Sequence, residues 1–438
     1  MRKFLSVFPL FVISFCSFSQ FKNIKLAEQS DDGGYPPVEP SITINKNNPQ
    51  NIVAGIVLDR VVTTTDGGTT WTESKLNSAF GVYGDPAVIS NAKGNVFYFH
   101  LADPSGKGQS NEAWLDRIVC QESIDEGKTW LEGVSIGNNP PADQDKAWPA
   151  VHPKKNFMCV TWTQFDKYGS KDPSCQSNIL FSKSNNGNRW STPVQINESP
   201  GDCLDDDFTA EGAVPAIGTD GKIYVAWANR GNIYFDRSYD EGNTWLRNDL
   251  LIAKQEGGWT LEIPGLERSN GLPVLAIDNS TSRYHGTLYL VWADQKNGKD
   301  DTDIWLIRST NRGDYWSKPV RINTDDSRTH QFLPWISVDP TNGHVYIVYY
   351  DRRNYEDNQT DVYLSYSFDG GNTFKEVKIS ETPFIPDAGK FFGDYTNIDA
   401  YGGVVTPIWT RMDSGKTSVL TTIIKDEELP KFEAVIKK

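Results

Sequence analysis

Short apolar runs that alternate with polar turns dominate this sequence. Six of the runs open with a proline followed by two small or apolar residues, as in Pro215-Ala216-Ile217, and each is followed after a turn by a second run such as 223–227. Proline is tolerated at the first residue of a strand, where no hydrogen bond of the sheet is lost. The six prolines are Pro40, Pro86, Pro149, Pro215, Pro273 and Pro334. The pattern predicts pairs of neighbouring strands repeated along the chain.

An eight-residue polar pattern follows these pairs and recurs at a steady interval. Its clearest copy is 238–245, which reads Ser-Tyr-Asp-Glu-Gly-Asn-Thr-Trp, and further copies stand at 64–71, 123–130 and 367–374. Two weaker copies, 183–190 and 309–316, carry Asn185 and Asn311 in the Asp place. Glycine supplies the positive φ that a hairpin turn needs, and the Asp and Ser side chains can bond free backbone N–H groups. We therefore interpret the pattern as a structural turn. Its long and steady period along the chain indicates a repeat architecture.

Each repeat contains strand, turn, strand, loop, strand, polar turn and strand, which is the order in a four-stranded propeller blade. A seventh unit begins at 394–398 and lacks the polar turn. The run 21–27 precedes the first unit, and we expect it to complete the last blade and close the ring. The prediction is an all-β propeller of four-stranded antiparallel blades, seven being favoured and six the alternative.

Composition and charge narrow the class of protein. The chain has 14 Trp, 18 Tyr, 36 Gly and 24 Pro, as expected for a turn-rich all-β protein. Its net charge of −14 argues against nucleic acid and anionic membranes as partners.

The first residues resemble an export signal. Met1-Arg2-Lys3 precedes an apolar run over 4–18, and small residues follow. We predict a signal peptide at 1–19, one propeller domain at 20–425 and a charged, frayed tail at 426–438. The mature protein would be secreted, periplasmic or on the cell surface, with no membrane insertion.

The cysteines lie in two kinds of sequence environment, polar loops and apolar runs. Among the four cysteines left after the leader, we choose Cys175 and Cys203 for a disulfide because both lie in polar loops. Cys120 and Cys159 lie in apolar runs and favour buried thiols. Asp202 and Asp205–Asp207 could hold a structural calcium ion, but a solvated loop fastened by Cys203 is the preferred interpretation, so we predict no metal site and no cofactor.

Candidate chemistry lies in the loops at the face opposite the polar turns. These loops, before the first strand and after the second strand of each unit, gather carboxylates, arginines and a tyrosine. The residues before first strands include Glu39, Asp85, Asp145, Lys146, Glu211, Arg268, His330, Asp394 and Tyr395. Those after second strands include Asp59, Arg230, Arg352, Arg353 and Arg411. Trp148, Trp162, Trp227 and Trp292 stand beside them as candidate platforms for sugar rings. Many of these groups could instead be ion pairs that close the ring, but the face as a whole favours a binding site.

The polar turns resemble the Asp boxes of the sialidase, or BNR-repeat, superfamily over nearly all of the mature chain. The resemblance implies a secreted glycosidase of sialidase type that acts on an acidic or decorated glycan. Glu211, followed by Arg230 across a strand, is similar to the family's glutamate and second arginine, and Tyr395 is similar in place to its nucleophile. On this basis Tyr395 would be the nucleophile, Glu211 its activator and Asp59 the acid/base. The candidate substrate-binding residues are Arg230, Arg268, Arg352, Arg353, Arg411, Asp85, Asp394, His330 and Trp148.

Two other classes of function stay open. The first inner strand begins with Glu39-Pro40, where sialidases carry an arginine, so the carboxylate clamp of that family is incomplete here. A polysaccharide lyase on the same fold would use Tyr395 or His330 to remove the proton beside a uronate carboxylate. A propeller that only binds glycans or proteins would use the same face as a platform.

Overall fold

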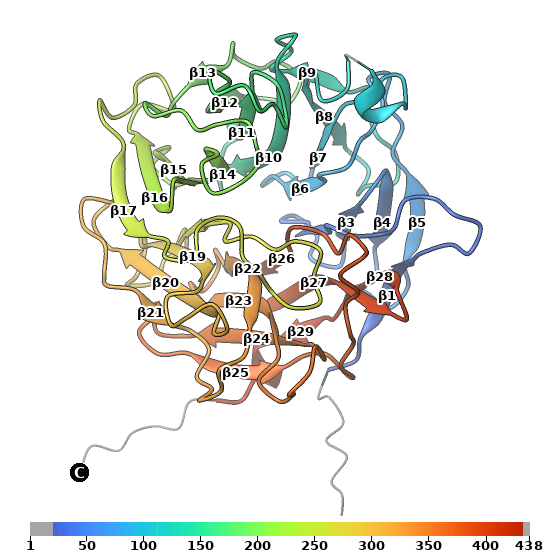
Figure 1. Cartoon of the computed structure of the whole chain (residues 1–438), viewed down its shortest axis with the longest axis vertical. Helices are drawn as coiled ribbons and strands as arrows, with labels where there is room; N and C mark the ends of the chain where they lie inside the picture. Colours follow the sequence, from blue (N-terminus) through green and yellow to red (C-terminus); the bar gives the residue numbers. More distant parts are fainter. Residues whose placement is uncertain (1–20, 112, 432–438) are drawn as a thin grey trace, which may run out of the picture.

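Seven antiparallel sheets form a ring in the computed structural model, which describes residues 21–111 and 113–431 (Figure 1). Six sheets contain four consecutive strands each, in chain order from the inside of the ring outward. In blade order these strands are β2 (Ser41–Ile44), β3 (Ile52–Ile56), β4 (Arg60–Thr64), β5 (Thr72–Lys75); β6 (Ala87–Ser90), β7 (Val96–Leu101), β8 (Ile118–Ser123), β9 (Val134–Ile136); β10 (Asp143–Val151), β11 (Met158–Phe165), β12 (Ser177–Ser184), β13 (Val194–Gln195); β14 (Glu211–Ile217), β15 (Ile223–Asn229), β16 (Asn232–Ser238), β17 (Leu250–Lys254); β18 (Val274–Ile277), β19 (Leu288–Asp294), β20 (Asp303–Ser309), β21 (Val320–Arg321); β22 (Gln331–Val338), β23 (Val345–Asp351), β24 (Asp361–Ser367) and β25 (Lys375–Lys378). The predicted all-β propeller and the favoured count of seven blades are confirmed.

The seventh sheet joins the two ends of the described chain. It contains β26 (Asn397–Tyr401), β27 (Val404–Asp413) and β28 (Lys416–Thr421), and its outer strand is β1 (Ile24–Glu28). β1 runs antiparallel to β28, with Ile24 opposite Thr421. A short strand, β29 (Ile424–Lys425), also pairs with β27. The strand that completes this blade therefore comes from the beginning of the chain.

The inner strands hold the ring together around its axis. Each of β2, β6, β10, β14, β18, β22 and β26 contacts the inner strand of the next blade, and β26 contacts β2. Between the blades, the second strands bury large side chains almost completely, including Trp162, Trp227, Trp292 and Trp409. Burial of such large apolar surfaces is the main favourable term in folding. Trp148, Trp162, Trp227 and Trp292 are therefore core residues, and the expectation that they form exposed platforms is wrong.

The repeated polar turn connects the third and fourth strands of the blades, as expected. In its clearest copy, Ser238 Oγ accepts a hydrogen bond from Gly242 N (2.8 Å), and Asp240 accepts from Thr244 N (2.8 Å). Hydrogen bonds from the Thr244 backbone, then from the Thr244 and Ser238 hydroxyl groups, lower the pKa of Asp240 to about 2. Trp245 packs edge-on against Phe181 of the preceding blade at 4.9 Å. The turn fastens neighbouring blades and satisfies its own polar groups.

One weak copy of this turn has a different register from the predicted one. Ser184 Oγ accepts a hydrogen bond from Gly187 N (3.0 Å), and Asn186 Oδ1 accepts from Asn188 N (3.0 Å). Asn186, and not Asn185, therefore fills the Asp place. The loop between the serine and the glycine is one residue shorter than in the other copies. Because the glycine and the tryptophan have the usual spacing, the sequence pattern does not reveal this deletion.

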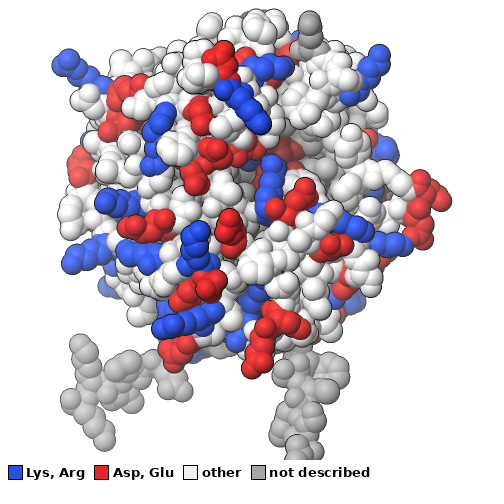
Figure 2. Space-filling model, viewed as in Figure 1, with Lys and Arg blue, Asp and Glu red and all other residues white. Residues whose placement is uncertain are grey.

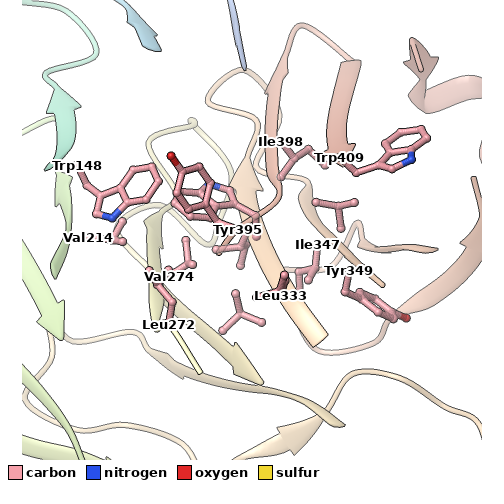
Figure 3. Close-up of a cluster of buried hydrophobic side chains, with 14 of the residues drawn as sticks. Trp148, Val214, Leu272, Val274, Leu333, Ile347, Tyr349, Tyr395, Ile398 and Trp409 are labelled. Atoms are coloured by element: carbon pink, nitrogen blue, oxygen red, sulfur yellow. The ribbon is translucent and has the colours of Figure 1, made fainter. Parts of the chain in front are cut away.

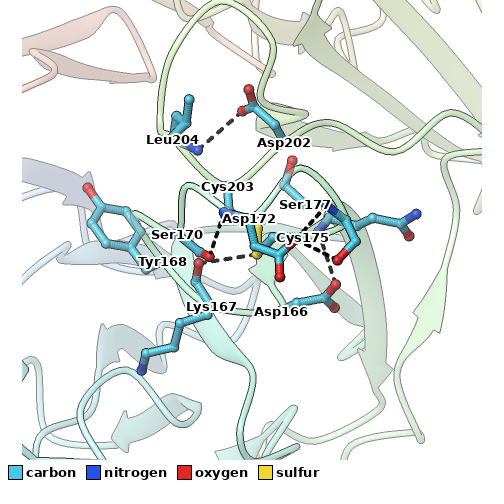
Figure 4. The surroundings of a disulfide bond; sticks show 12 residues. Asp166, Lys167, Tyr168, Ser170, Asp172, Cys175, Ser177, Asp202, Cys203 and Leu204 are labelled. Carbon is cyan, nitrogen blue, oxygen red and sulfur yellow. Dashed lines mark hydrogen bonds between the residues drawn. A yellow bond between two sulfur atoms is a disulfide. The ribbon is translucent and has the colours of Figure 1, made fainter.

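The disulfide between Cys175 and Cys203 is present, with the Cα atoms 5.8 Å apart, and Cys120 and Cys159 are buried thiols, as predicted (Figure 4). The predicted signal peptide lies outside the described residues. The start of the predicted frayed tail is ordered, since Asp426–Glu428 forms a 3-10 helix and Asp426 contacts His344 Nδ1 (2.7 Å). No helix in the described part of the chain is long and apolar enough to cross a membrane.

Candidate active site

Left-handed backbone conformations precede or interrupt several inner strands at the face opposite the polar turns. Glu39 (φ 50°), Asp85 (φ 46°) and Lys146 (φ 48°) all adopt this conformation, which is uncommon outside glycine. The pairing of β10 with β11 also shifts register between Asp145 and Trp148. Such bulges re-aim side chains, and backbone strain of this kind gathers at functional sites. Three blades therefore carry a charged residue on a strained segment near the axis.

Lys146 lies at the centre of a buried ionic cluster. Its Nζ is 3.5 Å from Asp145 Oδ2, 3.3 Å from Glu211 Oε1 and 3.5 Å from Asp394 Oδ2. The side chain is only 4% exposed, and burial by itself would lower its pKa, but the surrounding carboxylates raise the pKa well above its usual value. Lys146 is therefore a permanently charged ammonium that joins three blades.

Arg268 supplies the second cation of the cluster from the loop between β17 and β18. It forms ion pairs with Asp394 Oδ2 (2.5 Å) and with Asp205 Oδ2 (3.4 Å). The backbone N–H of Asp394 donates to Glu39 Oε1 (3.1 Å), which connects the cluster to the first blade. Like the ammonium of Lys146, the guanidinium is already neutralised by protein carboxylates.

Glu211 is completely buried, and its Oε1 lies 3.3 Å from Lys146 Nζ. Burial, followed by the nearby Asp205 carboxylate, raises the pKa of Glu211 well above its usual value. A protonated Glu211 can donate to Asp205, whereas two ionised carboxylates would both only accept. Burial would raise the pKa of Asp205 as well, but Lys146, Glu211 and Arg268 hold it below its usual value. The two carboxyl groups are thus pushed in opposite directions.

The loop that carries Asp205 is fixed on two sides. Tyr168 donates a hydrogen bond from its hydroxyl to Asp205 Oδ2 (2.6 Å). The Cys175–Cys203 disulfide, which Figure 4 shows beside Tyr168, joins this loop to the segment that follows β11. The sequence indicated a solvated acidic loop here, and for Asp205 that interpretation is wrong because its side chain is 9% exposed and ion-paired.

Tyr395 lies beneath the cluster among aromatic rings. Its ring is 4.9 Å from that of Trp148 and 6.1 Å from that of Trp335, and Figure 3 shows it beside Trp148 above a layer of aliphatic side chains. The hydroxyl is buried without a hydrogen-bond partner. Burial, and then the charge of Asp85, raises the pKa of Tyr395 well above its usual value, so the phenol is protonated. Tyr395 and Glu211 form no hydrogen bond with each other.

A cavity of about 290 Å³ opens above this cluster. Its charged lining consists of Glu39, Asp85, Asp145, Lys146, Arg268 and Asp394. Its aromatic lining consists of Tyr35, Tyr83, Trp114, Tyr168 and Phe391. Acidic and basic side chains both gather around the middle of the face in Figure 2. A concave, largely apolar site with converging polar groups is the usual form of a small-molecule pocket.

The acidity of the cavity residue Asp85 is strongly altered by its surroundings. Burial raises the pKa of Asp85 well above its usual value, and the carboxylates of Glu39 and Asp145 raise it further. Burial also raises the pKa of Glu39, to about 7. Two carboxyl groups with raised pKa values therefore face the same cavity as Asp145 and Asp394, which are ion-paired with Lys146, and such a mixed set suits acid and base catalysis.

The predicted candidates that precede first strands come together at this place. Glu211, Arg268, Asp85, Asp394, Tyr395 and Trp148 all belong to the cluster or to the aromatic layer under it. His330 is the exception, because it bonds Thr302 Oγ1 through Nδ1 (2.9 Å). Burial, followed by the charge of Arg352, lowers the pKa of His330 to about 4, so the ring is neutral.

The predicted candidates that follow second strands lie away from the cavity. Asp59 pairs with Lys75 (3.5 Å), Arg230 is exposed over the ring of Phe208, and Arg411 pairs with Asp413. Arg353 pairs with Asp351 (2.6 Å), and buried Arg352 donates to the carbonyl of Pro264 (2.6 Å). Turns after second strands are farther from the axis than the loops before first strands, which explains the separation. The carboxylate clamp built from Arg230, Arg268 and Arg352 is therefore not assembled.

Sequence reasoning missed Asp205 as a member of the site. A signal was available, since Asp205 lies two residues from Cys203 and six before Glu211. The four aspartates of this loop, Asp205 among them, are alike in sequence, however, and only the fold shows that Asp205 turns toward the cluster. Among the described residues, no group of three or more His, Cys, Asp or Glu side chains is arranged to hold a metal ion.

No family model matches the chain. A sialidase of Bacteroides fragilis (strain YCH46) is 29% identical over 92 residues, which is 16% of this chain and 17% of that protein. This chain therefore matches less than a fifth of that relative's length.

Two solved structures share the fold at low sequence identity. One is an ulvan lyase of a polysaccharide lyase family bound to -[GlcA(1-4)Rha3S]-, with a TM-score of 0.53, 12% identity, and coverage of 92% of this chain and 96% of that one. The other is an α-L-arabinofuranosidase from Fusarium graminearum, with a TM-score of 0.51, 12% identity, and coverage of 94% and 99%. Both are glycan-active propeller enzymes, and at these identities the likeness shows the fold alone.

Proposed function

We propose that the protein is a glycoside hydrolase that uses the cavity above Lys146 as its active site. One observation carries the proposal: Asp85, protonated by burial and by its acidic neighbours, shares a small cavity with Asp145 and Asp394. Glycosidases use two carboxyl groups on opposite sides of the scissile bond, one as an acid and one as a base or nucleophile. Asp85 is the acid in this proposal, and Asp145 or Asp394 is the second carboxyl group, the base or nucleophile.

Three groups beneath the cavity support this assignment. Lys146 holds Asp145 and Asp394 near each other through ion pairs with both. Glu211 contacts Lys146, and Tyr395 is buried below, so we give both a supporting role in tuning the site. The fold and the relative named above agree with an enzyme that acts on a carbohydrate.

Hydrolysis of sialosides is a narrower form of this proposal. It needs a cationic clamp for the sugar carboxylate, and Arg268 is the one predicted arginine that reaches the cavity. Because Arg268 is already paired with Asp394 and Asp205, binding of a sialic acid would have to displace one of these carboxylates. Sialosides therefore belong in the substrate panel as a defined alternative, with the lyase reaction beside them.

Export is part of the proposal. The Cys175–Cys203 disulfide is typical of oxidising compartments, and an enzyme for extracellular glycans would work there.

The test is a screen of the purified protein against neutral, amino and acidic glycans, including sialosides and uronate polysaccharides. New reducing ends without ultraviolet absorbance of an unsaturated product indicate hydrolysis, and absorbance indicates a lyase. For the best substrate, Asp85→Asn should lower kcat by about 10²- to 10⁴-fold, because that is the usual contribution of a general acid.

A matched control separates chemistry from folding. Glu241 lies on a polar turn at the face opposite the cavity, and its exposed carboxylate pairs with Lys155. The variant Glu241→Gln removes this charge and should keep the wild-type rate. Wild-type kcat in Asp85→Asn would contradict the proposed acid, and absence of products from every glycan would contradict hydrolysis.

A further inference from the structure

Carboxyl groups outnumber cations around the cavity. Six carboxyl groups surround it or lie directly beneath it, and only two cations stand among them. The carboxyl groups are Glu39, Asp85, Asp145, Asp205, Glu211 and Asp394. Both cations, Lys146 and Arg268, are occupied by ion pairs with these carboxylates. A ligand with a negative charge would therefore meet a site whose positive groups are already used.

A buried group in the cluster has no hydrogen-bond partner. It is the Tyr395 hydroxyl, on a residue that is 3% exposed. Buried polar groups are almost always bonded in native proteins, so such exceptions require an explanation. The charges that act on the Tyr395 phenol come from Asp85, Glu39, Asp394 and Lys146, all of which line the cavity. The phenol of Tyr395 is thus a buried donor among carboxyl groups, and the cluster holds fewer cations than carboxyl groups.

We propose that the cavity selects a sugar residue that carries a free ammonium group, such as a non-acetylated hexosamine, and excludes carboxylated sugars. This inference rests on the proposed function and gives its substrate class. An ammonium group supplies one positive charge and three donors, and the carboxyl groups of Glu39, Asp145 and Asp394 that line the cavity can accept them. The cavity of about 290 Å³ has room for a sugar ring.

The aromatic rim fits the rest of such a sugar. Tyr83 and Trp114 lie edge to face at 5.6 Å, and Tyr35 is 54% exposed beside them. Aromatic faces attract cations and pack against the apolar faces of sugar rings. Because no metal-binding group is formed among the residues described, we assign the cationic ligand to an organic ammonium.

Binding of such a ligand should release protons. Burial raises the pKa of Glu39 to about 7, and a positive charge placed beside Glu39 favours its ionised form, whereas the proposed acid, Asp85, keeps its proton. A neutral sugar would not change the protonation of Glu39 in this way. Proton release is therefore a signature of the ammonium contact that simple shape recognition would lack.

The experiment is isothermal titration calorimetry near pH 6 with eight sugars. These are glucose, glucosamine, N-acetylglucosamine and glucuronate, together with the four galactose counterparts. In at least one of the two series, the amino sugar should bind at least tenfold more tightly than the other three. Its binding heat should also change with the ionisation enthalpy of the buffer. Equal or stronger binding of the neutral, acetylated or acidic sugars in both series, or no binding of either amino sugar, overturns the proposal.

Variants locate the effect. Glu39→Gln keeps the shape of a cavity-lining side chain but removes its charge, and should reduce the preference for the amino sugar at least threefold and lower the proton release. Glu241→Gln should leave both unchanged. An unchanged preference in Glu39→Gln places the ammonium elsewhere and contradicts this site.

The binding test is independent of turnover. Selective binding of the amino sugar without hydrolysis of any amino glycan would support the site and reject the proposed hydrolase. Hydrolysis of neutral glycans without preference for the amino sugar would support the proposed hydrolase and reject the ammonium site.

Discussion

Aspartates at the two faces of the ring have opposite properties. At the polar turns, Asp240 accepts hydrogen bonds from Thr244 and Ser238, and its pKa falls to about 2. At the cavity, Asp85 has its pKa raised well above the usual value by burial and by other carboxylates. The same side chain is stabilised as a carboxylate at one face and as the neutral acid at the other.

This difference separates residues that stabilise the fold from residues available for chemistry. A carboxylate that is fully bonded by its own turn has no remaining capacity for a substrate. A carboxyl group held protonated in a cavity can give its proton to one. The face that carries the repeated motif is thus structural, and the irregular loops at the other face form the candidate active site.

The disulfide offers the strongest test of this division, because it fixes only the cavity side. The Cys175→Ser/Cys203→Ser double variant should lose about 3–4 kcal/mol of unfolding free energy, from the loop entropy of a cross-link over 28 residues. Freeing the Asp205 loop should also lower activity. Urea unfolding measures the first effect and kcat the second.

Reductant provides the control for the disulfide. It should destabilise the wild type to the same extent and have no further effect on the double variant, because the other thiols are buried. Full stability and activity after reduction would show that the loop does not depend on the cross-link.

Glu39 should make the cavity face less stable as pH rises. Its pKa is about 7 in the folded protein and 4.5 ordinarily, so the folded state binds the proton more tightly. The bound proton therefore stabilises the folded protein by up to ~3 kcal/mol. This contribution is complete below the unfolded pKa, falls as the pH rises from about 4.5 to 7, and is lost at higher pH.

The comparison is made with Glu39→Gln, which cannot ionise. Urea unfolding near pH 4.5 and near pH 8 should show a smaller decrease for this variant than for the wild type, and an ordinary decrease for Glu241→Gln. An equal decrease in Glu39→Gln would indicate that Glu39 ionises freely in the folded protein.

Ser238→Ala should give the smallest effect, and one confined to stability. The buried hydroxyl accepts from Gly242 N, and its loss leaves that N–H unpaired at about 1–3 kcal/mol. Because the turn lies at the face opposite the cavity, kcat should be unchanged below the melting temperature. A loss of kcat with an unchanged melting temperature would contradict the separation of the two faces.

The sequence predicted the candidate site unevenly, and chain position explains why. Residues before first strands, such as Glu211, Arg268 and Tyr395, converge because these strands line the axis. Residues after second strands, such as Asp59 and Arg411, share the face but lie farther out, so the same type of side chain forms local ion pairs. Radial distance from the axis is not encoded by residue type.

The sequence by itself determined the blades, their number and the structural role of the repeated turn. Alternation of apolar residues and the glycine and hydroxyl positions of the turn act over a few residues, so a local pattern is sufficient to specify them. The tertiary structure alone decided which charged groups meet. Lys146, Glu211 and Asp394 come from three blades, and their contacts depend on closure of the whole ring. The acidity of Asp85 depends in turn on burial and on neighbours distant in the chain, because desolvation and Coulomb forces act through space.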